Sequence, residues 1–163
     1  MEANIKHQIE LLDSKANKRV EKYSSPLLLE FFEGITSLGS PAILLIIIAV
    51  LFETGQTLAA SKLFASLLIA GIAVRGVKNL NGRTRPEDHR DPVYSEKSFP
   101  SGHSTAAFMT ATILTAFYSR PVTFFGLATT VAISRVYLKD HYLSDILAGG
   151  LLGTVIGIIA VAL

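Results

Sequence analysis

Three short clusters of polar residues interrupt a largely apolar chain, and their residue types could perform chemistry on an anion. They are "KNLNGRTRP" (78–86), "PSGH" (100–103) and "SRVYLKDHYLSD" (134–145). Together they supply basic side chains, histidines and an aspartate, which are groups that bind phosphate and transfer protons. Each cluster lies where an apolar run begins or ends, so we expect the ends of helices to position it.

The cations of these clusters predict a phosphate-binding site. Lys78, Arg85 and Arg135 adjoin apolar segments, where an unpaired charge is costly. One nearby aspartate cannot neutralise three cations, whereas a phosphate can, because its oxygens match the forked guanidinium groups. Ser101 and Gly102 begin an apolar run, where free backbone N–H groups favour an anion and glycine permits its close approach. The simpler alternatives are cations that reach the membrane interface or set topology.

Two histidines complete the pattern. His141 and Asp145 are four residues apart and so share one helical face. Asp145 can hold one ring nitrogen and leave the other free to attack, while His103 is expected to act as an acid–base group at the rim of the phosphate site. The alternative is a pair of structural histidines at helix ends. These side chains could also hold zinc, but the adjacent cations would repel it, so no metal or other cofactor is expected.

The elements that must position these groups are membrane helices. Half of the 163 residues are hydrophobic, and the runs 41–52 and 146–163 carry no charge. A span needs about 20 mainly apolar residues. We therefore expect an all-α integral-membrane bundle of five to six transmembrane helices, with apolar segments over 24–52, 58–80, 101–119, 122–138 and 142–163. Alternating spans bring the three clusters to one membrane face.

The N-terminal part is expected to differ from this bundle. Its apolar residues recur at helical spacing: Ile5, Ile9, Leu12, Ala16 and Val20. This pattern predicts an amphipathic interfacial segment over 1–23, preceding a membrane domain over 24–163; a solvated helical tail is the alternative. Within 24–52, the residues 39–41 indicate either one span broken there or an interfacial helix followed by a short span.

Written as spacings, the three clusters are K-x6-RP, PSGH and SR-x5-H-x3-D, in that order. This pattern resembles the three-part signature of the type 2 phosphatidic acid phosphatase (PAP2) superfamily at every specified position, over a region from about residue 24 to the C-terminus. The resemblance implies that His141 is the nucleophile and forms a phosphohistidine, while His103 protonates the leaving oxygen and then activates water. It implies that phosphate is bound by Lys78, Arg85, Ser101, Gly102 and Arg135.

The resemblance implies a metal-independent membrane phosphatase of a lipid phosphate or diphosphate. A polyprenyl diphosphate such as undecaprenyl diphosphate is the first expectation; phosphatidylglycerophosphate, phosphatidic acid and lipid A are the alternatives. A lipid phosphotransferase, a vanadium haloperoxidase and a lipid-phosphate-binding protein without turnover are further alternatives. The expected partners are the lipid substrate and membrane lipids, with no nucleic acid; the net charge of +2 by itself says little about nucleic acid.

Basic residues near the signature are expected to have other roles. Arg83, His89, Arg90 and Lys97 are predicted to lie in a solvated or head-group-facing loop. Arg75 lies one helical turn before the first signature residue, where a contact with phosphate is the weaker alternative to a role outside the site.

Two further features concern assembly and orientation. Gly149, Gly153 and Gly157 form a stripe that permits close helix contact; packing within one chain is favoured over a homodimer. With five spans the N-terminus shares the face of the site, and its basic residues would place that face inside the cell. Relatives that recycle lipid carriers face outward, so the resemblance favours a cell-membrane protein with its site on the outer face.

Overall fold

The structure is a computed structural model that describes residues 2–86 and 97–163, and its regular elements there are all helices. In chain order they are α1 (Glu2–Tyr23), α2 (Pro26–Thr36), the 3₁₀ helix η1 (Ser37–Gly39), α3 (Pro41–Glu53), α4 (Thr57–Leu80), α5 (Gly102–Tyr118), α6 (Pro121–Tyr137) and α7 (Leu143–Ala162). One isolated β-bridge joins Thr84 to Lys97. The expectation of an all-α fold is confirmed.

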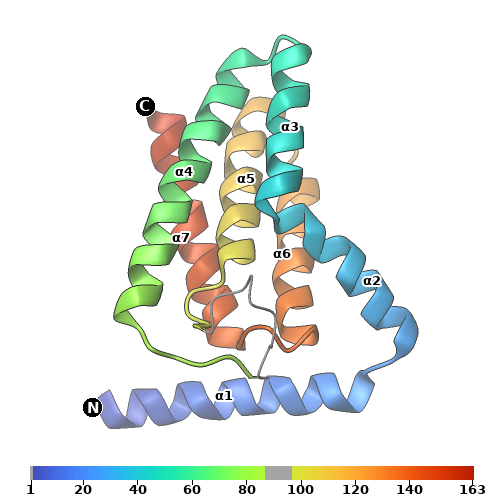
Figure 1. Ribbon diagram of the computed structural model, residues 1–163, viewed down its shortest axis with the longest axis vertical. Coiled ribbons are helices and arrows are strands. Elements are labelled where there is room, and N and C mark those ends of the chain that lie inside the picture. The colour runs from blue at the N-terminus through green and yellow to red at the C-terminus, as the bar shows by residue number, and fades with distance from the viewer. Residues whose placement is uncertain (1, 87–96) are drawn as a thin grey trace.

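Helix α5 lies at the centre of the bundle. Figure 1 shows α3 to α7 side by side, with α3 in the upper half and α1 crossing below the lower ends of α4, α6 and α7, and α5 packs against α4, α6 and α7. Met109 and Ile113 of α5 are fully buried in a core shared with α3, α4 and α7. Because α5 is surrounded, its N-terminal turn is held in a fixed place relative to three other helix ends.

Three glycines allow α7 to lie close against α5. Gly149, Gly153 and Gly157 recur every four residues along α7, and all are buried. A Cβ at Gly149 would lie 2.5 Å from the carbonyl oxygen of Ser101, and a Cβ at Gly153 would overlap the carbonyl of Thr105. The stripe therefore serves packing within one chain, and α5 leaves no room for a second copy at these glycines.

The apolar stretch 24–52 breaks where the sequence predicts. The pair α2–η1 and α3 is bent by 55°. Ser40 begins α3, its Oγ accepting a hydrogen bond from the N–H of Ile43 at 3.3 Å, and Pro41 takes the first helical position. Gly39 is buried at the bend, where a Cβ would lie 3.1 Å from the Cβ of His103. The break therefore packs against the first turn of α5.

The helices differ in whether they are long enough to cross a membrane. Among the described residues, α4 and α7 are long and apolar enough, and the bent pair of α2–η1 with α3 makes a third candidate. Helices α5 and α6 have 17 residues each, at the lower end of the length of a span. The structure thus supports a helical bundle compatible with a membrane, and the number of five to six spans stays a prediction.

Helix α1 divides its apolar residues between the bundle and the surroundings. Ala16 and Val20 pack against a small core formed by α6 and α7, whereas Ile5, Ile9 and Leu12 are exposed. The hydroxyl of Tyr137 donates to the carbonyl oxygen of Tyr23 at 3.2 Å and accepts the N–H of Ser25 at 3.1 Å. These contacts hold α1 across the end of the bundle.

We predict that Gly153→Ala destabilises the bundle, because the added methyl group would meet the backbone of α5 rather than a side chain that could move. Overpacking of this kind costs about 1–3 kcal/mol. Gly71→Ala is the matched control, since Gly71 lies in α4 with nothing within 4 Å of an added Cβ. Thermal unfolding in detergent, followed by circular dichroism, compares the two; equal midpoints would contradict the packing argument.

Candidate active site

The helix ends that carry the predicted site residues meet at one end of the bundle. In Figure 1 the last turns of α4 and α6 and the first turns of α5 and α7 lie at the end that α1 crosses. His141 lies beside Arg85 and Asp145. His103 is close enough to His141 and to all three predicted cations to interact with them electrostatically. Residues spread over much of the sequence therefore converge.

His141 occupies the turn between α6 and α7, with 2% of its surface exposed. The backbone N–H groups of Asp140 and His141 both donate to the carbonyl oxygen of Arg135, at 3.0 and 3.1 Å. The Nε2 atom of His141 lies 3.5 Å from Nη1 of Arg85, and Nδ1 lies 3.6 Å from Oδ2 of Asp145. A guanidinium can only donate, so the neutral ring carries its proton on Nδ1 and presents the Nε2 lone pair.

The protonation of His141 suits a nucleophile. Burial, with the charges of Arg85 and Arg135, lowers the pKa of His141 to about 4, although Asp145 opposes the shift. A charged ring would be poorly solvated here and repelled by the two guanidinium groups. The imidazole is therefore neutral at neutral pH, and Nε2 is available to attack.

Asp145 is fully buried and fixed through both carboxylate oxygens. Oδ2 accepts the N–H of Tyr142 at 2.9 Å, within a capping box at the start of α7. Oδ1 accepts from Nη1 of Arg83 at 3.0 Å. The backbone carbonyl oxygen of Asp145 also accepts the N–H of Ser101 at 3.1 Å. The acid that faces His141 is therefore tied directly to the PSGH segment.

The PSGH segment forms the N-terminus of α5. The Ser101 hydroxyl is buried and caps the helix, accepting from the Ser104 N–H at 3.4 Å and the Ser104 hydroxyl at 3.0 Å. A Cβ on Gly102 would meet only Val74 at 3.7 Å, so packing within the protein does not require this glycine. The first N–H groups of a helix lack intrahelical partners, which makes those of Gly102 and His103 candidate donors to an anion.

The carboxylate of Asp140, which was not predicted as a site residue, lies beside two of the predicted cations: its Oδ1 is 4.0 Å from Nη1 of Arg85, and its Oδ2 pairs with Arg135. Nη2 of Arg135 pairs with Oδ2 of Asp140 at 2.5 Å, and its Nη1 donates to the hydroxyl of Thr36 at 2.8 Å. Nη1 of Arg85 donates to the carbonyl oxygen of Asp140 at 3.0 Å. The premise that a single aspartate faces the cations is therefore wrong, because Asp140 lies between two of them.

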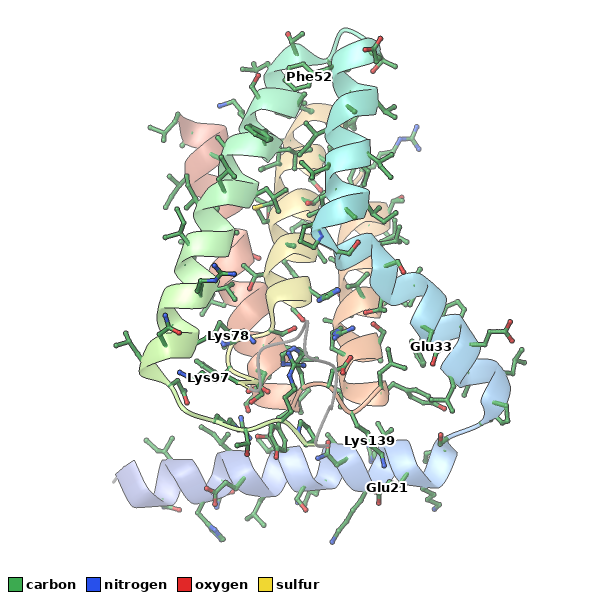
Figure 2. All side chains as sticks on the ribbon, viewed as in Figure 1. Glu21, Glu33, Phe52, Lys78, Lys97 and Lys139 are labelled. Carbon is green, nitrogen blue, oxygen red and sulfur yellow. The ribbon has the colours of Figure 1, made fainter. Side chains whose placement is uncertain are left out.

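The third cation, Lys78, lies at the edge of the site. Its Nζ donates to the carbonyl oxygen of Lys97 at 2.5 Å, and Figure 2 shows the two lysines close together near the lower end of α4. The N–H of Ser98 donates to the carbonyl oxygen of Arg83 at 2.8 Å, next to the bridge between Thr84 and Lys97. The segment after α4 is thus joined to the segment before α5, and Lys78 holds this junction.

The prediction that Arg83 belongs to a solvated loop is wrong. Its Nη2 pairs with Oδ2 of Asp13 at 2.6 Å, and its Nη1 lies 2.6 Å from the Ser144 hydroxyl and 3.0 Å from Oδ1 of Asp145. The guanidinium also stacks on the ring of Tyr142, 3.9 Å from its centroid. A signal was present in the sequence: Asp13 shares a helical face with Ala16 and Val20, the residues of α1 that pack on the bundle.

Of the other basic residues named from the sequence, the structure describes Arg75 and Lys97. Arg75 is exposed on α4, so the structure does not bring it to the site. Lys97 is partly buried, and its Nζ lies 3.4 Å from the carbonyl oxygen of Asn79. His89 and Arg90 fall outside the described residues. Within 2–86 and 97–163, no three His, Cys, Asp or Glu side chains are grouped as a metal site.

We predict that wild type loses stability between pH 7.5 and pH 5.5 more steeply than His141→Gln does. The pKa of His141 is about 4 in the folded protein and has an ordinary value of 6.5. Below pH 6.5 the unfolded chain binds a proton that the folded chain excludes, so stability falls as the pH drops. At pH 5.5 this group contributes about 1 kcal/mol of the loss. Thermal unfolding in detergent at both pH values measures it, and identical pH dependence of the two proteins would contradict the assignment.

Curated proteins of similar sequence are lipid phosphatases by name. The chain is 34% identical over 99 residues to the lipid A 1-phosphatase of Rhizobium etli, an alignment that covers 53% of this chain and 42% of the relative. It is 27% identical over 161 residues to phosphatidylglycerophosphatase B of Bacillus subtilis, covering 89% of this chain and 79% of the relative. The chain thus spans less than half of the lipid A 1-phosphatases that it matches.

Solved structures with this fold cover nearly the whole chain. The crystal structure of a transmembrane PAP2 type phosphatidylglycerolphosphate phosphatase from Bacillus subtilis matches with a TM-score of 0.80 and 28% identity, over 94% of this chain and 84% of that one. The crystal structure of Aquifex aeolicus LpxE matches with a TM-score of 0.79 and 25% identity, over 91% and 94%. A family model for the PAP2 superfamily matches residues 59–163, which include all three clusters. The chain therefore belongs to the PAP2 superfamily.

Proposed function

We propose that this protein is a membrane phosphatase that hydrolyses a lipid phosphate ester through a phosphohistidine intermediate on His141. The observation that carries the proposal is the placement of His141. Its Nε2 faces Arg85 at 3.5 Å, its Nδ1 faces the buried carboxylate of Asp145, and its neutral ring can attack phosphorus at neutral pH. The membership of the chain in the PAP2 superfamily and the names of its relatives support the same chemistry.

The reaction takes two steps. In the first, Nε2 of His141 attacks the phosphorus, the bond to the lipid oxygen breaks, and His103 in its protonated form donates a proton to the leaving alkoxide. In the second, His103 takes a proton from water as the water oxygen attacks phosphorus, the P–N bond breaks, and inorganic phosphate leaves. Asp145 stabilises the His141 ring while Nε2 carries the phosphoryl group. Water enters only in the second step, and at the end of the two steps both histidines are back in their starting state.

The cations supply the charge stabilisation that phosphoryl transfer needs. Phosphoryl transfer depends mainly on positioning and on neutralising the phosphate oxygens. Arg85 and Arg135 are buried beside His141 with forked donors, and Lys78 adds a third positive charge at the edge. The free N–H groups at the start of α5 and the positive end of its helix dipole further stabilise the phosphate. We propose that these groups do the work that Mg²⁺ does in other phosphoryl-transfer enzymes.

The substrate is proposed to be a lipid whose phosphate lies near the membrane surface. Helices α4 and α7 can cross a membrane, and the site lies at their ends. Relatives are named for phosphatidylglycerophosphate and for lipid A, which favours these monoesters over the polyprenyl diphosphate expected from the sequence. We propose five spans, counting α5 and α6, with the site on the outer face of the cell membrane.

We predict that both histidines are needed for turnover and that no divalent metal is. Phosphate release is measured in detergent with excess EDTA, from phosphatidylglycerophosphate, lipid A, phosphatidic acid and undecaprenyl diphosphate. His141→Ala is expected to reduce release to background, and His103→Ala to reduce it by about 10²–10⁴-fold, the contribution of a positioned acid–base group. Wild type should be unaffected by EDTA. Release by His141→Ala, or loss of wild-type release in EDTA, would refute the proposed mechanism.

We predict that α1 and the site face outward. The chain has no cysteine, so Lys18→Cys on α1 and Gln56→Cys at the turn between α3 and α4 each introduce a single thiol. Both positions are exposed, and they lie at opposite ends of the bundle. A membrane-impermeant maleimide should label the thiol at position 18 in intact cells and the thiol at position 56 only after permeabilisation. The reverse pattern would place the site on the cytoplasmic face.

A further inference from the structure

One acidic residue of α1 is buried in the ion-pair network that holds the candidate site. Asp13 has 2% of its surface exposed, although nearly all of its neighbours along α1 are exposed. Its Oδ2 pairs with Arg83 at 2.6 Å and accepts the Ser144 hydroxyl at 2.8 Å, and its Oδ1 accepts the Ser144 N–H at 2.9 Å. Both oxygens of this carboxylate therefore accept hydrogen bonds. The donors are Arg83, which also binds Asp145, and Ser144, which precedes Asp145 in the sequence.

We propose that Asp13 is a positioning residue for the proposed phosphatase reaction, acting through Arg83 and Ser144 on Asp145. The inference rests on the proposed function, because it assumes that the acid behind His141 matters for catalysis. It assigns to α1 a part in the reaction, although α1 lies outside the residues 59–163 that define the family match.

The first path runs through Arg83. The Nη1 atom of Arg83 donates to Oδ1 of Asp145, while its Nη2 is held by Asp13. A guanidinium bridging two carboxylates has a fixed plane, because each nitrogen donates in a set direction. The ring of Tyr142 supports the same plane from one side. Removing Asp13 would leave Arg83 bound at one end only and free to rotate away from Asp145.

The second path runs through the first turn of α7. The Ser144 N–H is one of the donors at a helix start that the helix itself cannot satisfy. Asp13 accepts this hydrogen bond from another helix, and its negative charge lies at the positive end of α7. Asp145 is the next residue in that turn. Asp13 therefore fixes the backbone from which the Asp145 side chain projects toward His141.

Docking of α1 on the bundle does not by itself require Asp13. Ala16 and Val20 pack on α6 and α7, and Tyr137 hydrogen-bonds the backbone of Tyr23 and Ser25. Glu21 pairs with Lys139 at 3.7 Å, at a more exposed place on the same helix; Figure 2 labels this pair where α1 meets the bundle. Glu21 therefore offers a matched comparison: a carboxylate of α1 paired with a cation of the bundle, but away from Asp145.

The test compares Asp13→Asn with Glu21→Gln in the phosphate-release assay with phosphatidylglycerophosphate. Asp13→Asn should lower kcat about 10-fold, the lower end of the effect of losing an outer partner of a metal-bound histidine, with KM within about 2-fold because Asp13 does not touch phosphate. Glu21→Gln should keep wild-type kcat. Arg83→Gln and the double variant complete a cycle, in which the combined loss should be smaller than the product of the single losses, because both residues act on Asp145.

Each outcome decides the inference. A wild-type kcat in Asp13→Asn, an equal loss in Glu21→Gln, or fully multiplicative losses in the cycle would overturn it. A thermal midpoint of Asp13→Asn equal to that of Glu21→Gln would show that the lower kcat comes from a misplaced Asp145 and not from unfolded protein. His141→Ala is assayed in parallel: activity in that variant refutes the proposed function itself, whereas loss of activity there with no effect at position 13 refutes only the role of Asp13.

Discussion

The structure depends on a balance of charge at one end of an apolar bundle. Burying a single ion costs several kcal/mol unless a partner compensates for the lost water. Arg85 and Arg135 have side chains only 6% and 5% exposed, and they lie beside the carboxylate of Asp140. Arg83 lies between Asp13 and Asp145 in the same way. Arg85 and Arg135 therefore remain buried near His141, and Arg83 remains beside Asp145, because neighbouring acids hold them there.

The second requirement is the close contact between α5 and α7. The glycine stripe of α7 lets the two backbones approach until the N–H of Ser101 reaches the carbonyl oxygen of Asp145. Any side chain at Gly149 would push apart the two helix starts that carry the PSGH segment and Asp145. The same glycines therefore determine both the packing of the apolar helices and the geometry of the polar site.

Helix α1 has both exposed apolar residues and a buried acid that contacts this site. Its exposed residues include Ile5, Ile9 and Leu12, which suit a membrane surface, while its buried acid joins the network at the start of α7. The bundle end would otherwise leave Arg83 with a single carboxylate. A helix outside the region of the family match thus supplies one of the acids that balance the charge. The residues that hold the site therefore extend beyond the three signature clusters.

The sequence alone determined the helices, the break near Pro41 and the convergence of the three clusters, because hydrophobic period, proline position and alternation of spans are local properties or follow from them. It did not reveal that Arg83 contacts Asp145. Nor did it reveal that Asp13 and Asp140 are the acids that pair with the basic side chains of the site. Asp13 is 70 residues from Arg83 and 131 from Ser144, and no period in the sequence relates positions so far apart. Only the packing of α1 on the bundle brings Asp13 within a hydrogen bond of Arg83 and Ser144, so the tertiary structure decided which acid holds Arg83.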